Sequence, residues 1–220
     1  MEDLTDNERE EQLRRWWGDN WLWIVGGIAL GLALLGGWQY WKQSRVNAAE
    51  QDEASYVAVI DALGQDQLEQ ARAHARELRD RRPDSPYADQ ADLALARMAV
   101  DKGEFDDAAQ RLRTVMDGSR DAELRAVART RLARVLLEQG KPDEALGLLD
   151  PAGAGAFTAL YHEIRGDAYA AKGDSQAAAT EYDAALAAGE EAGIDRAFVE
   201  LKRDALPAAP AAAAPEVPTP

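Results

Sequence analysis

The sequence predicts an all-α protein in which a single N-terminal transmembrane helix is followed by a solenoid of helical repeats. Residues 21–41 contain no charged side chain, and apolar residues recur every three or four positions almost throughout the chain after Lys42. Helix-breaking glycines also return at nearly constant spacing in this second part. These three observations predict an apolar helix first and paired helices after it, with no strand.

The composition argues against nucleic-acid binding and against most kinds of enzyme. The 25 Lys and Arg residues against 40 Asp and Glu give a net charge of −15, which a phosphate backbone would repel. With no cysteine, and only His74 and His162 as histidines, thiolate chemistry, metal centres and catalytic triads have almost no side chains to use. No nucleotide-binding, metalloprotease or nucleophile-elbow motif is present. We therefore expect a non-enzymatic protein without cofactor, metal or small-molecule substrate.

Residues 21–41 form the predicted membrane anchor. As a helix that rises about 1.5 Å per residue, these 21 residues span about 30 Å, the thickness of a bilayer core. A core helix of a soluble protein would need a polar stripe, and a cleaved signal peptide has a shorter apolar region followed by small residues; the sequence fits neither alternative. Amphipathic aromatic rings mark both ends, where the lipid headgroups begin: Trp21, Trp23, Trp38, Tyr40 and Trp41.

The basic residues that flank the anchor give only a weak prediction of its orientation. Arg9, Arg14 and Arg15 precede the anchor, whereas Lys42 and Arg45 follow it. Because basic residues are retained on the cytoplasmic side, this margin of one residue favours a cytoplasmic N-terminus and a translocated C-terminal part. The charge count leaves the opposite orientation open.

Two glycines in the anchor, Gly27 and Gly31, have the spacing at which two membrane helices can approach each other closely. Glycine is also common in membrane helices generally. Self-association through this face, contact with a different helix and the absence of any helix partner all remain open.

The helical repeats are indicated by the glycines Gly103, Gly140 and Gly173. These are separated by 37 and 33 residues, close to the period of tetratricopeptide repeats, and each lies between two predicted helices. The spacing predicts about three clear repeats, each a pair of antiparallel helices. Residues 50–83 supply a degenerate pair before them, which gives enough repeats to bury a continuous core.

The last repeat is the closest to the tetratricopeptide consensus. Paired helices approach to about 8–10 Å only if one side chain at the crossing is short, so small residues are expected there. The residues that define this repeat are Gly166, Tyr169, Gly173, Ala178, Tyr182 and Ala185.

The composition divides the chain into four parts. An acidic tail precedes the anchor, the repeats follow it, and the chain ends in an Ala/Pro-rich segment that has almost nothing to bury and should be unfolded. The predicted boundaries are residues 1–20, 21–41, 42–206 and 207–220.

Solenoids of this kind bind peptides or partner domains in the groove that the first helix of each pair lines. The register places six residues at equivalent groove positions: Leu93, Arg97, Thr130, Arg134, Glu163 and Asp167. The lysine and asparagine clamp that holds a C-terminal carboxylate in some repeat proteins is absent from these positions. One hypothesis is that Arg97 and Arg134 hold a partner, and the alternative is that they are solvated helix residues.

Several strings of the sequence together resemble a known family. The anchor ends in GW-x-YW, formed by Gly37, Trp38, Tyr40 and Trp41, and LARMAVDKGEFDDAAQRL, LRAVARTRLARVLLEQGKPDEAL and IRGDAYAAKGDSQAA follow. On these strings, residues 10–190 resemble the ancillary SecYEG translocon subunit family of Gram-negative bacteria, which combines a short cytoplasmic tail, one anchor and a periplasmic tetratricopeptide-like domain. The Ala/Pro segment is not part of the shared pattern.

The resemblance implies a non-enzymatic scaffold in the inner membrane, with its N-terminus in the cytoplasm and its repeats in the periplasm. The implied partners are the SecYEG translocon and a membrane-anchored periplasmic chaperone of the prolyl-isomerase type, and the implied role is the hand-over of exported envelope proteins. Two alternatives stay open, both independent of the translocon: a membrane-tethered regulator of an envelope stress response, and a scaffold for another envelope assembly. The family has no catalytic residues to transfer to this chain.

Overall fold

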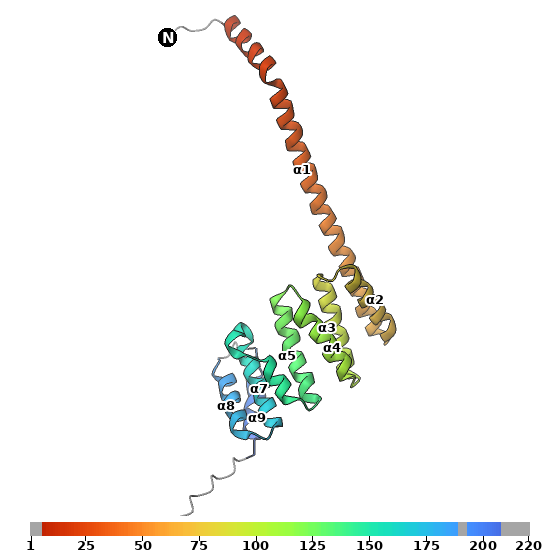
Figure 1. Cartoon of the computed structure of the whole chain (residues 1–220), viewed down its shortest axis with the longest axis vertical. Helices are drawn as coiled ribbons and strands as arrows, with labels where there is room; N and C mark the ends of the chain where they lie inside the picture. Colours follow the sequence, from red (N-terminus) through yellow and green to blue (C-terminus); the bar gives the residue numbers. More distant parts are fainter. Residues whose placement is uncertain (1–5, 189–192, 208–220) are drawn as a thin grey trace, which may run out of the picture. The chain divides into compact units, whose positions relative to one another are not determined.

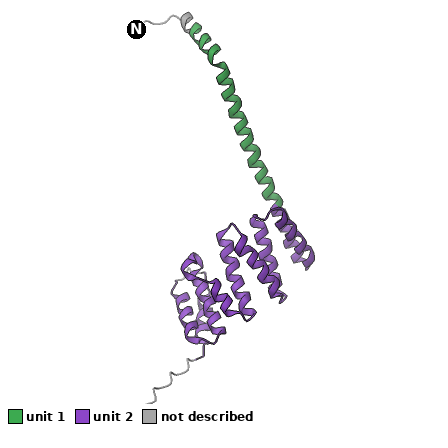
Figure 2. Cartoon of the chain, in the orientation of Figure 1, with its two compact units in different colours: residues 1–51 green, residues 52–220 purple. Residues whose placement is uncertain are grey.

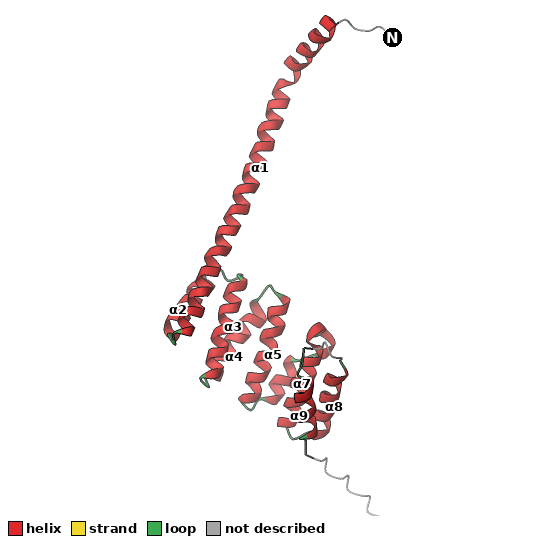
Figure 3. Cartoon of the chain, turned by 180° about the vertical axis from the view of Figure 1, so that it is seen from behind, coloured by secondary structure: helices red, strands yellow, loops and turns green. Residues whose placement is uncertain are grey.

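The computed structural model describes residues 6–188 and 193–207. Within these residues the secondary structure consists of helices and turns with no strand (Figure 3), which confirms the predicted all-α class. The chain divides into two compact units, Met1–Gln51 and Asp52–Pro220 (Figure 2). The Ala/Pro tail that the sequence predicts to be unfolded lies, from residue 208 onward, outside the described residues.

The first unit is helical from Asp6 to its end. It belongs to α1 (Asp6–Gly64), a helix of 59 residues whose last turns are part of the second unit. By length and apolar composition α1 can cross a membrane, and none of its apolar window is buried. The aromatic rings at both ends of the predicted anchor are exposed, with 82% of Trp23 and 79% of Tyr40 accessible. A core helix of a soluble protein would have this apolar surface covered.

The second unit is a stack of short helices in which each helix packs on its neighbours along the chain (Figure 1). It begins with the end of α1, where Val59 and Ala62 are buried in an apolar cluster shared with α2 and α3. The other helices are α2 (Leu68–Arg81), α3 (Pro86–Asp101), α4 (Phe105–Gly118), α5 (Ala122–Glu138), α6 (Pro142–Leu148), α7 (Thr158–Ala171), α8 (Ser175–Ala187) and α9 (Arg196–Asp204).

Three glycines form the tight turns within the pairs α3/α4, α5/α6 and α7/α8. Gly103, Gly140 and Gly173 have φ angles of 75°, 71° and 78°, in the left-handed region that residues with a Cβ atom disfavour. Each turn ends one helix and lets the next run back beside it. The glycine spacing in the sequence is therefore the spacing of the helix pairs.

The crossing of α7 and α8 is closely packed around Gly166. A Cβ atom at this position would overlap the ring of Tyr182. Burial and the hydrogen bond that the Tyr182 hydroxyl donates to Asp167 Oδ1, at 2.8 Å, both raise the pKa of Tyr182, so the hydroxyl stays protonated at neutral pH. The apolar cluster at this crossing contains Tyr169, Ala178, Tyr182 and Ala185.

The C-terminal half has two features that the sequence reading does not predict. Helix α6 has only 7 residues, and the chain continues through two short 3-10 helices, η1 (Pro151–Gly153) and η2 (Gly155–Phe157), before α7 begins. Proline at position 151 cannot continue a helix from the residues before it. Helix α9 follows the last pair, and its Val199 is buried in the apolar cluster of α8. The solenoid therefore ends in a helix that covers the last repeat.

Candidate partner-binding groove

The structure does not bring the six predicted groove residues to one surface. Leu93 is 7% exposed and belongs to the core, and Thr130 is 4% exposed. The Thr130 hydroxyl donates a hydrogen bond to a backbone carbonyl of its own helix at 2.8 Å. Arg97 and Arg134 are exposed on α3 and α5. These two arginines are therefore the predicted residues that a ligand can reach without moving other parts of the structure.

Arg97 and Arg134 border an open groove of about 320 Å³ between α3, α4 and α5. A third arginine, Arg131, also lines it, although the repeat register does not select this residue. Because residues three positions apart lie on the same face of a helix, its spacing from Arg134 is the sequence signal that identifies it. We call this site the arginine groove; its lining consists of Ala96, Arg97, Val100, Leu112, Arg131, Arg134, Val135 and Glu138.

The arginine groove carries an excess of positive charge. Burial lowers the pKa of Arg131, and the neighbouring charges of Arg97 and Arg134 lower it further. Within residues 6–188 and 193–207, neither Arg97 nor Arg131 forms an ion pair, and Arg134 lies 3.7 Å from Glu163 Oε2. The one acidic residue of the lining, Glu138, also forms no ion pair in the described part of the chain.

The acidic end of the predicted groove is closed by α9. Lys202 donates hydrogen bonds to Glu163 Oε1 and Asp167 Oδ2, both at 2.9 Å. Asp167 also accepts the hydrogen bond of Tyr182, and Glu163 is only 6% exposed. Both carboxylates therefore have partners inside the structure, and a ligand would have to compete with Lys202 for them.

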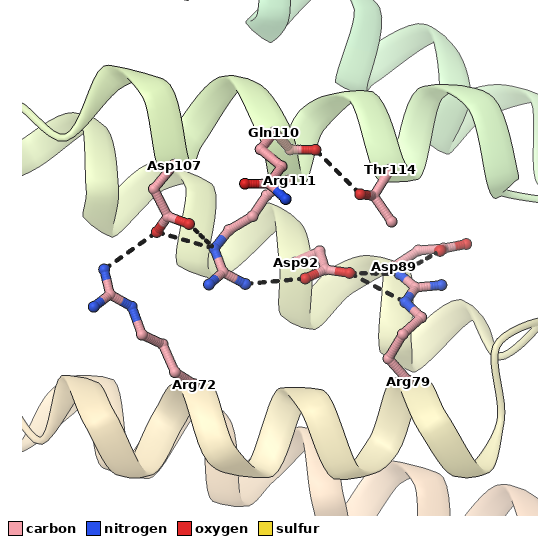
Figure 4. A network of polar contacts seen from close by, with 8 residues as sticks. All are labelled: Arg72, Arg79, Asp89, Asp92, Asp107, Gln110, Arg111 and Thr114. Atoms are coloured by element: carbon pink, nitrogen blue, oxygen red, sulfur yellow. Dashed lines mark hydrogen bonds and ion pairs between the residues drawn. The ribbon is translucent and has the colours of Figure 1, made fainter.

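A second group of arginines connects α2, α3 and α4 and is paired with acids (Figure 4). Arg79 Nη2 lies 2.7 Å from Asp92 Oδ2 and 2.9 Å from Asp89 Oδ1, and Arg111 Nη1 lies 3.2 Å from Asp92 Oδ1. Burial lowers the pKa of Arg79, but its contacts with Asp92 and Asp89 outweigh burial and raise the pKa overall. We call this group the paired cluster; its members are Arg72, Arg79, Asp89, Asp92, Asp107 and Arg111.

The histidines take part in structural contacts or lie on the surface. His162 Nδ1 is 2.7 Å from Glu181 Oε2, and Glu181 Oε1 also accepts a hydrogen bond from Arg165 Nε at 2.8 Å. His74 is half-buried on α2. In the described part of the chain, no group of three or more His, Cys, Asp or Glu side chains could hold a metal ion.

The fold and the groove together define a class: a helical-repeat protein that carries one N-terminal helix able to cross a membrane. Comparison with protein families agrees with this class, because residues 14–208 match the model of the tetratricopeptide repeat-like domain. The match includes the apolar part of α1 as well as the repeats.

Two relatives identify the family more closely. The chain is 30% identical over 185 residues to the Ancillary SecYEG translocon subunit of Escherichia coli strain K12. This match covers 83% of this chain and 87% of the relative. It is 28% identical over 200 residues to the protein of the same name from Haemophilus influenzae, and this match covers 90% of this chain and 96% of the relative. The chain belongs to the family of ancillary SecYEG translocon subunits. No solved structure matches it.

Proposed function

We propose that the protein is a non-enzymatic, single-pass subunit of the inner membrane that associates with the Sec translocon. Its repeats dock a membrane-anchored periplasmic chaperone of the prolyl-isomerase type and so aid the hand-over of exported envelope proteins. The observation that carries the proposal is the similarity to the two relatives, which extends over most of each chain. The tetratricopeptide-like fold and the name of the relatives both point to a protein that binds other polypeptides and does not catalyse a reaction.

The proposal assigns a task to each part of the chain. The acidic tail, residues 1–20, lies in the cytoplasm; residues 21–41 cross the membrane; and residues 42–206 form the periplasmic domain, which the Ala/Pro segment, residues 207–220, follows in the sequence. Three basic residues precede the anchor and two closely follow it, and this excess of one supports the orientation. Because the anchor holds the repeats beside the channel exit, their effective concentration near a partner is high, and weak contacts suffice for docking.

Copurification tests the association with the translocon. The full chain, tagged at its C-terminus, is isolated from crosslinked membranes, and we expect the channel subunits and a periplasmic chaperone to copurify with it. The matched control keeps the repeats but replaces residues 21–41 with an unrelated apolar span, and it should lose the channel. If the native chain does not retain the channel, the proposed function is wrong.

The orientation can be tested with single introduced thiols, because the chain has no cysteine of its own. Gln12→Cys precedes the anchor, and Asp117→Cys lies on the exposed end of α4. In spheroplasts, a membrane-impermeant maleimide should label only Asp117→Cys. Labelling of only Gln12→Cys would place the repeats in the cytoplasm and contradict the proposal.

The acidic tail favours one rival function, a membrane-tethered regulator whose tail contacts a signalling protein of an envelope stress response. Deleting residues 2–8 and 10–13 while keeping Arg9, Arg14 and Arg15 leaves the basic flank of the anchor intact and separates the two functions. A translocon scaffold should still copurify with the channel after this deletion, whereas a regulator of this kind should lose control of the stress response.

A further inference from the structure

The floor of the arginine groove is apolar and partly open. Val100 of α3 is 37% exposed, whereas Ala96, Leu112 and Val135, which share the lining, are buried beneath it. An apolar side chain of a ligand that covers this floor would remove apolar surface from water, which is favourable. The floor therefore provides a position for one apolar side chain, against Val100.

The arginines around this floor provide the second recognition element. Arg97 and Arg131 have no acidic partner among the described residues, although the chain as a whole carries a net charge of −15. Their mutual repulsion would be relieved by carboxylates, because an opposite charge within a few ångströms favours the charged form of arginine. Guanidinium groups also bind carboxylates through two parallel hydrogen bonds.

The length of the groove limits how much of a ligand it can hold. On α5 the lining runs from Arg131 to Glu138, which is about 10 Å along a helix axis. An extended peptide covers this distance with roughly three or four residues. Glu138 lies at one end of this stretch and would repel a carboxylate, so the acidic residues of the ligand belong beside Arg131 and Arg134.

We propose that the arginine groove binds a short acidic segment of a partner protein, with an apolar side chain on the floor and carboxylates against Arg97, Arg131 and Arg134. This inference rests on the proposed docking function and names the chemistry of the partner. A contact of this size is weak by itself, and it becomes sufficient when both proteins are held at the same membrane.

Fluorescence anisotropy with synthetic peptides tests the proposal on the full chain in phosphatidylcholine nanodiscs. The probe is the labelled peptide GGEDVLEDGG, in which an acidic pair stands on each side of a valine and a leucine, so that either direction of binding places one pair beside Arg131 and Arg134 and leaves the other pair outside the groove. We expect it to bind at least about tenfold more tightly than its amide counterpart GGQNVLQNGG and more tightly than GGEDSSEDGG, which lacks the apolar pair. Binding should also weaken as salt is raised.

Two matched variants locate the binding site. The triple variant Arg97→Gln, Arg131→Gln and Arg134→Gln should lose about tenfold or more in affinity for GGEDVLEDGG. Arg113→Gln removes a charge from α4 outside the groove lining and should bind as the native chain does. Circular dichroism of each variant checks that the helices are retained.

Several results would overturn the proposal. Equal binding of the acidic and amide peptides would remove the role of the arginines, and equal weakening by Arg113→Gln would show a general charge effect. Loss of peptide binding in phosphatidylglycerol nanodiscs would indicate that the groove meets the anionic membrane surface instead. The peptide test does not involve the channel. If the peptide binds but the channel does not copurify, the translocon role alone is rejected. If the channel copurifies but the peptide does not bind, the role of the groove alone is rejected.

Discussion

The paired cluster and the arginine groove both contain arginines, but in the part of the chain that the structure describes the arginines are paired with acids in the first region and mostly unpaired in the second. In the paired cluster, Arg79 of α2 meets Asp89 and Asp92 of α3, and both carboxylates are largely buried. In the groove, Arg97 of α3 instead faces Arg131 and Arg134 of α5. Charge in the first region joins helices of the solenoid to one another, whereas charge in the second region remains available for a ligand.

The end of the solenoid is an intermediate case. Glu163 and Asp167 occupy groove positions in the repeat register, yet Lys202 of α9 pairs with both of them. A position in the repeat register therefore does not decide whether a charged residue is available to a partner protein. The neighbouring helix decides it, by supplying or withholding the opposite charge.

Removing a member of the paired cluster should have the largest effect. Arg79→Met leaves Asp89 and Asp92 without their main partner in a nearly buried site, and we expect a loss of about 3 kcal/mol in the free energy of unfolding. Chemical denaturation of the full chain in detergent, followed by circular dichroism, measures this loss. Arg113→Met, which breaks a long and exposed ion pair, should change the same quantity by less than about 0.5 kcal/mol. If the two variants lost the same free energy of unfolding, the ion pairs of the paired cluster would stabilise the fold no more than an exposed ion pair does.

Lys202→Met should have a smaller effect of the same sign, about 1–2 kcal/mol, because Arg134 and Tyr182 still contact the two carboxylates. The same denaturation measurement applies. Lys172→Met breaks a contact with exposed Asp143 and serves as the control, with no change in the denaturation midpoint expected. If Lys202→Met were as harmless as its control, α9 would not be fastened to the acidic end of the register.

Glu181 offers a test of pairing through pH. Burial raises the pKa of its carboxyl group, but hydrogen bonds from Arg165 and His162 outweigh burial, so the folded pKa lies below the ordinary value of 4.5. The pairing therefore stabilises the fold at neutral pH, and this contribution is lost as the pH falls below that value, through the folded pKa. The difference in unfolding free energy between the native chain and Glu181→Gln should shrink in acid, as the pH falls through the folded pKa of Glu181. A difference that does not change with pH would show that the pairing does not depend on the charge of Glu181.

In the arginine groove, removing one charge should cost no stability. Arg131→Gln relieves repulsion from Arg97 and Arg134, so the free energy of unfolding should stay within about 0.5 kcal/mol of the native value or rise slightly. The same variant should weaken binding of the acidic peptide. A large loss of stability would mean that Arg131 holds the fold together, as the arginines of the paired cluster do, and is not held in reserve for a ligand.

Most of the fold could be predicted from the sequence because short local patterns mark the turns between helices and the apolar segment. Gly103, Gly140 and Gly173 are needed where the backbone takes a positive φ, so their spacing reports the helix pairs directly. The apolar segment of α1 is recognised from its length and composition alone. The short α6 and the covering helix α9 depend on contacts between distant residues, which a local pattern does not contain.

The candidate site was harder to predict because a shift of one position turns a helical side chain by about 100°. The repeat register selects Leu93 and Thr130, which face the interior, and passes over Arg131, which lines the groove. It also cannot show that Lys202, far along the chain, would cover Glu163. The pairing of charges across helices is a property of the folded solenoid.

Site-specific photocrosslinking in intact membranes shows which proteins the anchor and the arginine groove contact. Photoreactive residues replace Ala33 in the anchor, Val100 on the floor of the arginine groove, and Arg113 outside it. We expect crosslinks from Ala33 to the channel and from Val100 to a periplasmic chaperone, with neither partner crosslinked from Arg113. Crosslinks from Ala33 only to other copies of this chain, together with crosslinks from Val100 only to cytoplasmic proteins, would contradict both the proposed orientation and the proposed function.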